Sequence, residues 1–433
     1  MADQALRPPP EERALGLEFY ATRTPGVAAK IKTDPGDFEV EEISRYPLPE
    51  AEGPFSVLRI RSTDWEQHEL GRALARSLGV RPSAMAWAGT KDRRAVAERL
   101  ASYRGALPDR ELGLPRVELL EAYRARDGLS LGHHYGNSFR IRLVGTSIDA
   151  ERAGTTLAAT REALRETLGI PNLFGPQRFG EVRPVTHLVG RELVRGDAAS
   201  AVEIYLADRV PGGEGPGDEA RRSYAEHHDP ARALREFPEP YRFERTLLER
   251  LARGRSPEQA LMALPADLRR LFVHAYQSYL FNRIVSGRVA SGVALTAPQL
   301  GDRVVRLGTD GTPARLPPII ATSDNEREVR ETVVRGRGVV AGPLVGYGTP
   351  PIEGRTGETL DALLEADGVH RESFGLTSMP SEGSEGTWRP FVVPPPPIGI
   401  SPAGEGDLVV RFALPKGSYA TVLTREFLKS GAA

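Results

Sequence analysis

The chain has 433 residues, of which 40% are hydrophobic and 27% charged, with 57 Lys and Arg against 58 Asp and Glu. This length allows two to four domains, and the composition is that of a globular rather than a disordered protein. A net charge of −1 excludes a uniformly basic nucleic-acid coat, but not a local basic cleft. The absence of cysteine excludes disulfides, thiolate nucleophiles and cysteine-ligated metal sites. Since neither a signal-peptide pattern nor a long apolar run occurs, we expect a soluble cytoplasmic protein.

Regular patterns predict a mixed α/β unit over residues 16–168. Residues 1–13 are rich in proline and charge and are predicted to be disordered. Asp64 is a candidate N-cap for the helix predicted at 66–78. Alternation predicts strands at 38–43, 55–61, 116–125 and 137–145, and helical spacing predicts helices at 66–78, 93–103 and 147–168.

The middle of the chain has a different character. Residues 184–262 read as helical, interrupted by a flexible loop at 210–218, and a long helix is expected at 266–288. Residues 290–375 mix glycine-rich turns with short strands, and 380–397 read as an exposed linker. The final segment reads as strand, turn and helix. We expect it to rejoin the first sheet, which makes the middle an insertion.

One string, AGTKDRRAVAERL, could carry chemistry. Gly89 allows a tight turn that would present Asp92 at a sheet edge, with Lys91 and two arginines beside it. Surrounding cations favour an ionised carboxylate, which a nucleophile requires. The alternative is an aspartate that caps a helix with a solvated basic face.

Two further segments suit RNA contact. In PNLFGPQRFG, Arg178 lies beside Phe174 and Phe179, a composition that fits phosphate contact plus stacking and equally fits a packed hinge. Residues 268–301 contain four arginines and no acidic residue, which suits phosphates, although a solvated basic face is the alternative for each arginine. Phe38, Phe139 and Tyr419 each lie close to Gly or Pro, and an aromatic on an alternating strand is ordinarily core.

Six strings, in order from Lys32 to Thr421, together resemble the TruD family of tRNA pseudouridine synthases. HAYQSYLFN and the opening FYATRTPG are most similar to the archaeal and eukaryotic branch. The chain departs from the family pattern at Gly36, Leu173 and Ala97, where Glu, Tyr and Thr are usual, so no hydroxyl is present at residue 97. The six strings are KTDPGDFEVEE, GTKDRRAVA, GNSFRI, PNLFGPQRFG, HAYQSYLFN and LPKGSYAT.

The resemblance implies an isomerase that converts a uridine of tRNA to pseudouridine by base flipping, without cofactor or metal. Uridine 13 is the family's usual target, and other RNAs are alternatives. The family's catalytic aspartate falls on Asp92, and we hypothesise that Lys32 pairs with it and keeps it ionised. Asn137 would hydrogen-bond the edge of the base. The other implied substrate-binding residues are Phe38, Phe139, Tyr419, Lys91 and Arg178.

The resemblance also implies a fold of the α+β class. We expect a pseudouridine-synthase-type mixed, largely antiparallel sheet with flanking helices, plus a mainly helical insertion domain, with tRNA in the cleft between them. The predicted limits are a tail at 1–13, a catalytic domain at 14–170 and 376–433, and the insertion at 171–375. No oligomeric state, membrane contact or nucleotide cofactor is predicted.

Two rival functions stay open at this point. One is a non-catalytic RNA-binding or tRNA-folding protein that uses the same cleft. The other is a glycosidase-like hydrolase, which normally needs a paired acid and base.

A last pattern concerns the five lysines, Lys30, Lys32, Lys91, Lys416 and Lys429. Codon bias explains their scarcity, but three of them fall inside the six strings, which suggests positions where a compact ammonium is needed.

Overall fold

The computed structural model describes residues 6–108, 111–146, 148–167, 169–180, 182–209, 215–308, 311–314, 316–404 and 406–429. The chain divides into two compact units. Unit 1 comprises residues 1–6, 20–170 and 393–433, and unit 2 comprises residues 7–19 and 171–392. The domain limits given from the sequence stay predictions, except that Pro10–Arg13, expected to be disordered, form the helical turn α1.

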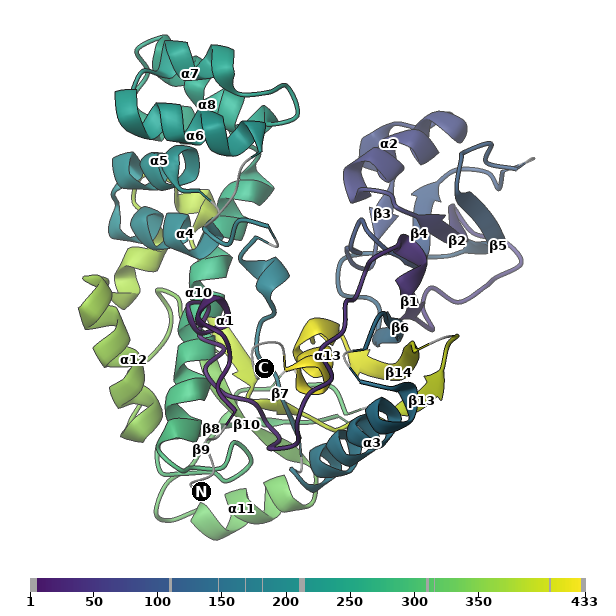
Figure 1. Cartoon of the computed structure of the whole chain (residues 1–433), viewed down its shortest axis with the longest axis vertical. Coiled ribbons are helices and arrows are strands. Elements are labelled where there is room, and N and C mark those ends of the chain that lie inside the picture. Colours follow the sequence, from purple (N-terminus) through teal and green to yellow (C-terminus); the bar gives the residue numbers. More distant parts are fainter. Residues whose placement is uncertain are drawn as a thin grey trace. The chain divides into compact units, whose positions relative to one another are not determined.

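Unit 1 contains, in its described part, an eight-stranded sheet in the order β13–β14–β6–β1–β4–β2–β5, with β3 paired to β4 (Figure 1). β1 and β4 pair in parallel, and the other neighbouring strands are antiparallel. This confirms the mixed, largely antiparallel sheet, and the pairing of β14 with β6 confirms that the last segment rejoins it. The strands are β1 (Phe38–Ile43), β2 (Phe55–Thr63), β3 (Ala86–Trp87), β4 (Val96–Arg104), β5 (Val117–Ala125), β6 (Gly136–Leu143), β13 (Gly399–Pro402) and β14 (Leu408–Pro415).

The two faces of this sheet differ because side chains alternate along each strand. One face is apolar and packs against the helices α2 (Gln67–Ser77), α3 (Ala150–Glu166) and α13 (Ala420–Leu428). The opposite face carries ion pairs, such as Arg140 with Glu39 at 2.7 Å. Both side chains of that pair are more than one-third exposed, so each such pair contributes little to stability.

The helix predicted at 93–103 is wrong, since this segment forms β4. Alanine, arginine and glutamate favour a helix locally, but β4 pairs with β1 on one side and with β2 on the other, and that tertiary pairing decides the outcome. The predicted N-cap is also wrong. Glu66, not Asp64, caps α2 by accepting from the backbone N–H groups of His68 and Glu69.

Unit 2 is mainly helical and is organised around α10 (Ala266–Ala290), which packs against α4, α12 and β10 (Figure 1). Its described part also holds a four-stranded sheet, β11–β10–β8–β9. The other helices are α4 (Thr186–Arg195), α5 (Ala198–Ala207), α6 (Pro216–His227), α7 (Pro230–Glu236), α8 (Arg242–Ala252), α9 (Pro257–Leu261), α11 (Glu326–Val334) and α12 (Gly354–Asp367). The strands are β8 (Arg303–Arg306), β9 (Ile319–Ile320), β10 (Gly338–Leu344) and β11 (Thr387–Pro390); elsewhere, β7 (Ile170–Pro171) pairs with β12 (Val392–Val393).

These bounds confirm the helical run at 184–262 and the long helix from Ala266, but they correct two other predictions. Residues 290–375 also contain the helices α11 and α12. The segment 380–397 is not a free linker, because it holds β11 and β12 and buries Phe391 completely. The loop predicted at 210–218 lies largely outside the described residues, and α6 begins at Pro216.

His187 on α4 is buried between the rings of Phe179 and Tyr279, with centroid distances of 5.2 and 5.0 Å. Burial, with a smaller contribution from Arg191, lowers the pKa of His187 to about 4. The imidazole is therefore neutral in the folded protein at neutral pH.

Unit 2 should consequently lose stability as the pH falls. The unfolded chain takes up a proton near pH 6.5, and the folded chain takes it up only near pH 4. Between these values the unfolded state is increasingly favoured, by up to about 3 kcal/mol. Urea unfolding at a series of pH values should show this loss in the wild type and a smaller one in His187→Phe. Exposed His68→Gln serves as the control, and equal pH dependence in all three proteins would contradict the prediction.

Candidate active site

Asp92 lies in the loop that joins β3 to β4. Gly89, near the start of this loop, has the ring of His134 against it, and a Cβ there would lie 2.9 Å from His134 Cε1. The Ala88 carbonyl accepts hydrogen bonds from the Gly132 N–H, at 2.7 Å, and from His134 Nδ1, at 3.0 Å. Contacts from Gly132 and His134, in the segment before β6, therefore hold the loop that carries Asp92 in place.

Lys32 contacts Asp92 directly, with 2.7 Å between Lys32 Nζ and Asp92 Oδ2. The Lys32 side chain is 8% exposed and the Asp92 side chain 34%. One carboxylate thus faces a shielded ammonium and keeps access to solvent. Lys32 has a φ of 57°, in the left-handed region that ordinary side chains avoid, which costs about 1 kcal/mol. Such a strained residue persists only where the surroundings fix it, and these residues cluster at functional sites.

Aromatic rings adjoin this ion pair. Lys32 Nζ lies 4.5 Å from the centroid of the Phe38 ring, and Phe38 meets Phe139 edge to face at 5.9 Å. Phe139 in turn lies 5.5 Å from Phe412 of β14. Phe38 and Phe139 are buried in the apolar core of unit 1. Phe38 thus forms an apolar wall beside the ion pair, and a contact of either ring with a base stays a prediction.

Asn137 of β6 lies directly opposite Glu42 of β1 in the strand register. Opposite residues of an antiparallel pair point to the same face. Asn137 Oδ1 and Glu42 Oε1 are both buried and have no hydrogen-bond partner among the described residues. Two unused acceptors are therefore present on this face of the sheet. Tyr419 is half-buried and stands at the N-cap of α13.

Lys91, expected to bind substrate, is instead paired with Glu42 inside the protein. The Nζ–Oε2 distance is 3.1 Å, and the side chains are 3% and 1% exposed. Burial lowers the pKa of Lys91 and outweighs the opposing attraction of Glu42. Since Lys91 precedes Asp92, this ion pair fixes the loop to β1, and this position suits a structural anchor better than a contact with substrate.

Breaking this buried pair should strongly destabilise unit 1. We expect Lys91→Met to lower the free energy of unfolding by about 3–5 kcal/mol, because Glu42 is left buried without its ion-pair partner. The matched control is Arg140→Met, which removes the exposed pair with Glu39 and should cost no more than about 1 kcal/mol. Urea unfolding measures both, and equal losses would show that the burial of the pair has no special effect.

Arg178 lies in unit 2, where its Nε donates to Ser278 Oγ at 3.1 Å and its guanidinium lies 5.7 Å from the Phe174 ring. The rings of Phe174 and Phe179 are both buried against other side chains of unit 2, and stacking of a base on either ring stays a prediction. This favours the packed reading of the segment, and contact of Arg178 with RNA stays a prediction.

The acid-free stretch at 268–301 is not a free basic face. Arg269 and Arg288 are buried and form ion pairs with Glu382, at 2.5 Å, and with Asp302, at 2.8 Å. The other two arginines also contact acids, Arg270 with Asp267 and Arg283 with Glu18. The two buried arginines, Arg269 and Arg288, are thus neutralised by acids from outside the stretch, and contact of the more exposed Arg270 and Arg283 with phosphates stays a prediction.

Reasoning from the sequence missed Glu42 and His134. For Glu42 a signal existed, because period-2 alternation places it on the same face as the apolar Phe38 and Val40. No local signal pointed to His134, whose role depends on contacts with Ala88 and Gly89 more than forty residues away.

In the part of the chain that the structure describes, no group of three or more His, Asp or Glu side chains could hold a metal ion. None of the described helices is both long and apolar enough to cross a membrane.

Comparison with known proteins places this fold in a class. A crystal structure described as "Putative tRNA pseudouridine synthase D (TruD)" from Methanosarcina mazei matches with a TM-score of 0.80 and 31% identity, covering 97% of this chain and 98% of that one. The α+β fold is therefore that of a TruD-type pseudouridine synthase.

The family follows from the sequence comparisons. The family model described as tRNA pseudouridine synthase D (TruD) matches residues 14–427. Two relatives named "Probable tRNA pseudouridine synthase D" come from Halobacterium salinarum, 36% identical, and Archaeoglobus fulgidus, 37% identical. Each alignment covers 97% of this chain, and 98% and 99% of the respective relative. The chain belongs to the TruD family.

Proposed function

We propose that the protein isomerises a uridine of tRNA, at position 13, to pseudouridine. Membership of the TruD family supports the activity and the tRNA substrate. The observation that carries the assignment to this site is the contact at 2.7 Å between Asp92, which is partly open to solvent, and Lys32, which is almost fully shielded.

The reaction exchanges one bond for another. The bond between N1 of uracil and C1′ of the ribose breaks, the base turns, and C5 bonds to C1′. A proton leaves C5 and one is gained at N1, so the product is an isomer and no redox partner is needed. In this proposal Asp92 is the nucleophile of the first step: its carboxylate bonds to the nucleotide and is released again by the time C5 has bonded to C1′. Lys32 stabilises the negative charge of the carboxylate and aligns it.

Recognition of the base fits the remaining groups. A uridine inside folded RNA has to leave its stack to reach Asp92. Asn137 Oδ1, buried and without a described partner, is suited to accept the N3–H of the flipped uracil. The apolar wall at Phe38 would exclude water while the base is detached.

The test uses an unmodified tRNA transcript and a matched transcript in which uridine 13 is replaced by cytidine. After incubation with the protein, base-specific chemistry maps pseudouridine. We expect product at position 13 of the first transcript and none at that position of the second. Product only at another uridine would move the target, and free uracil would indicate a hydrolase. Binding without any product would favour a non-catalytic tRNA-binding protein.

A further inference from the structure

We propose that Glu426 and Lys429, at the end of α13, are positioning residues that fix the backbone of residues 20–24 and thereby the segment that delivers Lys32 to Asp92. This inference rests on the proposed function. Within the described chain, residues 17–34 contain no helix or strand beyond an isolated bridge at Lys30. Contacts with other parts of the protein must therefore hold this segment in place.

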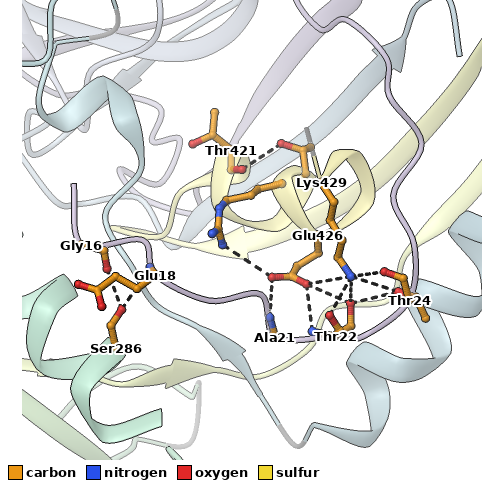
Figure 2. Close-up of polar contacts among 11 residues, drawn as sticks. Gly16, Glu18, Ala21, Thr22, Thr24, Ser286, Thr421, Glu426 and Lys429 are labelled. Carbon is orange, nitrogen blue, oxygen red and sulfur yellow. Dashed lines mark hydrogen bonds and ion pairs between the residues drawn. The ribbon is translucent and has the colours of Figure 1, made fainter. Parts of the chain in front are cut away.

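The Glu426 carboxylate accepts hydrogen bonds from donor groups of residues 20–24 (Figure 2). Its Oε1 accepts from the Ala21 N–H at 2.8 Å, and its Oε2 accepts from the Thr22 N–H at 3.1 Å and from Thr22 Oγ1 at 3.0 Å. The carboxylate is 3% exposed. Hydrogen bonds to a charged and shielded acceptor are the stronger kind.

The Lys429 ammonium donates hydrogen bonds to acceptor groups of the same segment (Figure 2). Its Nζ donates to the Thr22 carbonyl at 2.8 Å, to Thr22 Oγ1 at 2.7 Å and to the Thr24 carbonyl at 2.5 Å. The side chain is fully buried, and Glu426 lies 3.9 Å away. Three donors meet three close oxygen atoms, an arrangement that matches an ammonium better than a planar guanidinium.

The rest of the segment follows the same helix. The Val27 N–H donates to the Phe427 carbonyl at 2.8 Å. A Cβ on Gly26 would overlap the Leu428 carbonyl, so the backbone of the segment packs directly against the end of α13. Lys30 then exchanges backbone hydrogen bonds with Val144 just beyond β6, and Lys32 follows two residues later. α13 also begins directly after Tyr419, so one helix adjoins both Tyr419, predicted to bind the substrate, and the segment that carries Lys32.

If the Glu426–Lys429 pair acts through Lys32, its loss should reduce turnover rather than tRNA binding. We expect Lys429→Met to lower kcat by about 10- to 100-fold, the range in which small displacements of catalytic groups fall, with KM for tRNA changed little. Glu426→Gln should act in the same direction. Arg221→Met is the matched control, because it breaks a buried ion pair with Glu244 in unit 2 and should leave kcat unchanged.

The decisive measurement combines Lys429→Met with Lys32→Met. A positioning residue has no further effect once the group that it positions is gone, so the double variant should turn over at the rate of Lys32→Met alone. Losses that multiply, or a wild-type kcat in Lys429→Met, would overturn the inference. Circular dichroism checks folding, and if Lys429→Met does not fold, Thr22→Val removes one contact to each charged group and should give a smaller loss of kcat. A wild type that forms no pseudouridine would refute the proposed function instead.

Discussion

Asp92→Asn should abolish pseudouridine formation, with a loss in kcat of at least about 10³-fold, while the protein still folds and binds tRNA. The substitution keeps the shape of the side chain and removes its charge and its ability to act as a nucleophile. Because the Asp92 side chain is 34% exposed, the change should have little effect on the fold. A single-turnover assay on unmodified tRNA, with product mapped by base-specific chemistry, measures the loss.

The control for this experiment is Asp64→Asn. Asp64 is a carboxylate with a similar exposure of 30%, and it lies 3.7 Å from Arg93 and 3.4 Å from Arg116. The Asp64→Asn variant should keep its activity, because an exposed ion pair contributes little to stability and Asp64 is not expected to touch the base. Product from Asp92→Asn at a rate near that of the wild type would refute the role of Asp92. Equal losses in both variants would point to a general effect of charge near this loop.

Alternation predicted the strands of unit 1 where one face is apolar and the other polar. The strands at Phe38–Ile43 and Phe55–Thr63 are of this kind. The same rule did not identify β4, which is rich in alanine, arginine and glutamate and buries parts of both faces. Its partners β1 and β2 lie elsewhere in the sequence, so the stabilisation that makes this segment a strand has no local signature.

The site shows the same limit for charges. The family resemblance predicts that Lys32 pairs with Asp92, and the structure brings the two side chains into contact. In the sequence Lys91 belongs to a basic cluster, but Glu42, forty-nine residues earlier, neutralises it inside the protein. Arg269 and Arg288 are neutralised in the same way, by Glu382 and Asp302. Counting charges along a segment therefore says little about the charge in space.

The lysines support the idea that a compact ammonium matters. In Lys32, Lys91 and Lys429, the Nζ of a buried side chain contacts the oxygen of another side chain. Lys416 Nζ donates to the Gly132 carbonyl beside the Asp92 loop. Lys30 is exposed, and its described contacts are backbone hydrogen bonds. The chain thus retains lysine mainly where a small cation fits between fixed oxygen atoms.

Lys32→Met should give the second large effect, a fall in kcat of about 100-fold with little change in tRNA affinity. Without the ammonium at 2.7 Å, the carboxylate of Asp92 loses both its counter-charge and its alignment. Lys32→Arg should restore little of this activity. The ammonium occupies a shielded place 4.5 Å from the centre of the Phe38 ring, and a guanidinium is larger and planar.

Lys30→Met is the matched control for this prediction, since Lys30 lies in the same segment and is exposed. We expect single-turnover rates equal to the wild type for Lys30→Met and reduced rates for both Lys32 variants. Full activity of Lys32→Met at neutral pH would show that Asp92 needs no cationic partner. Full activity of Lys32→Arg would show that charge alone is sufficient there. Because Lys32 is held in a left-handed backbone conformation, a rate that depends on the exact cation indicates that this strain serves to place one small charge against the nucleophile.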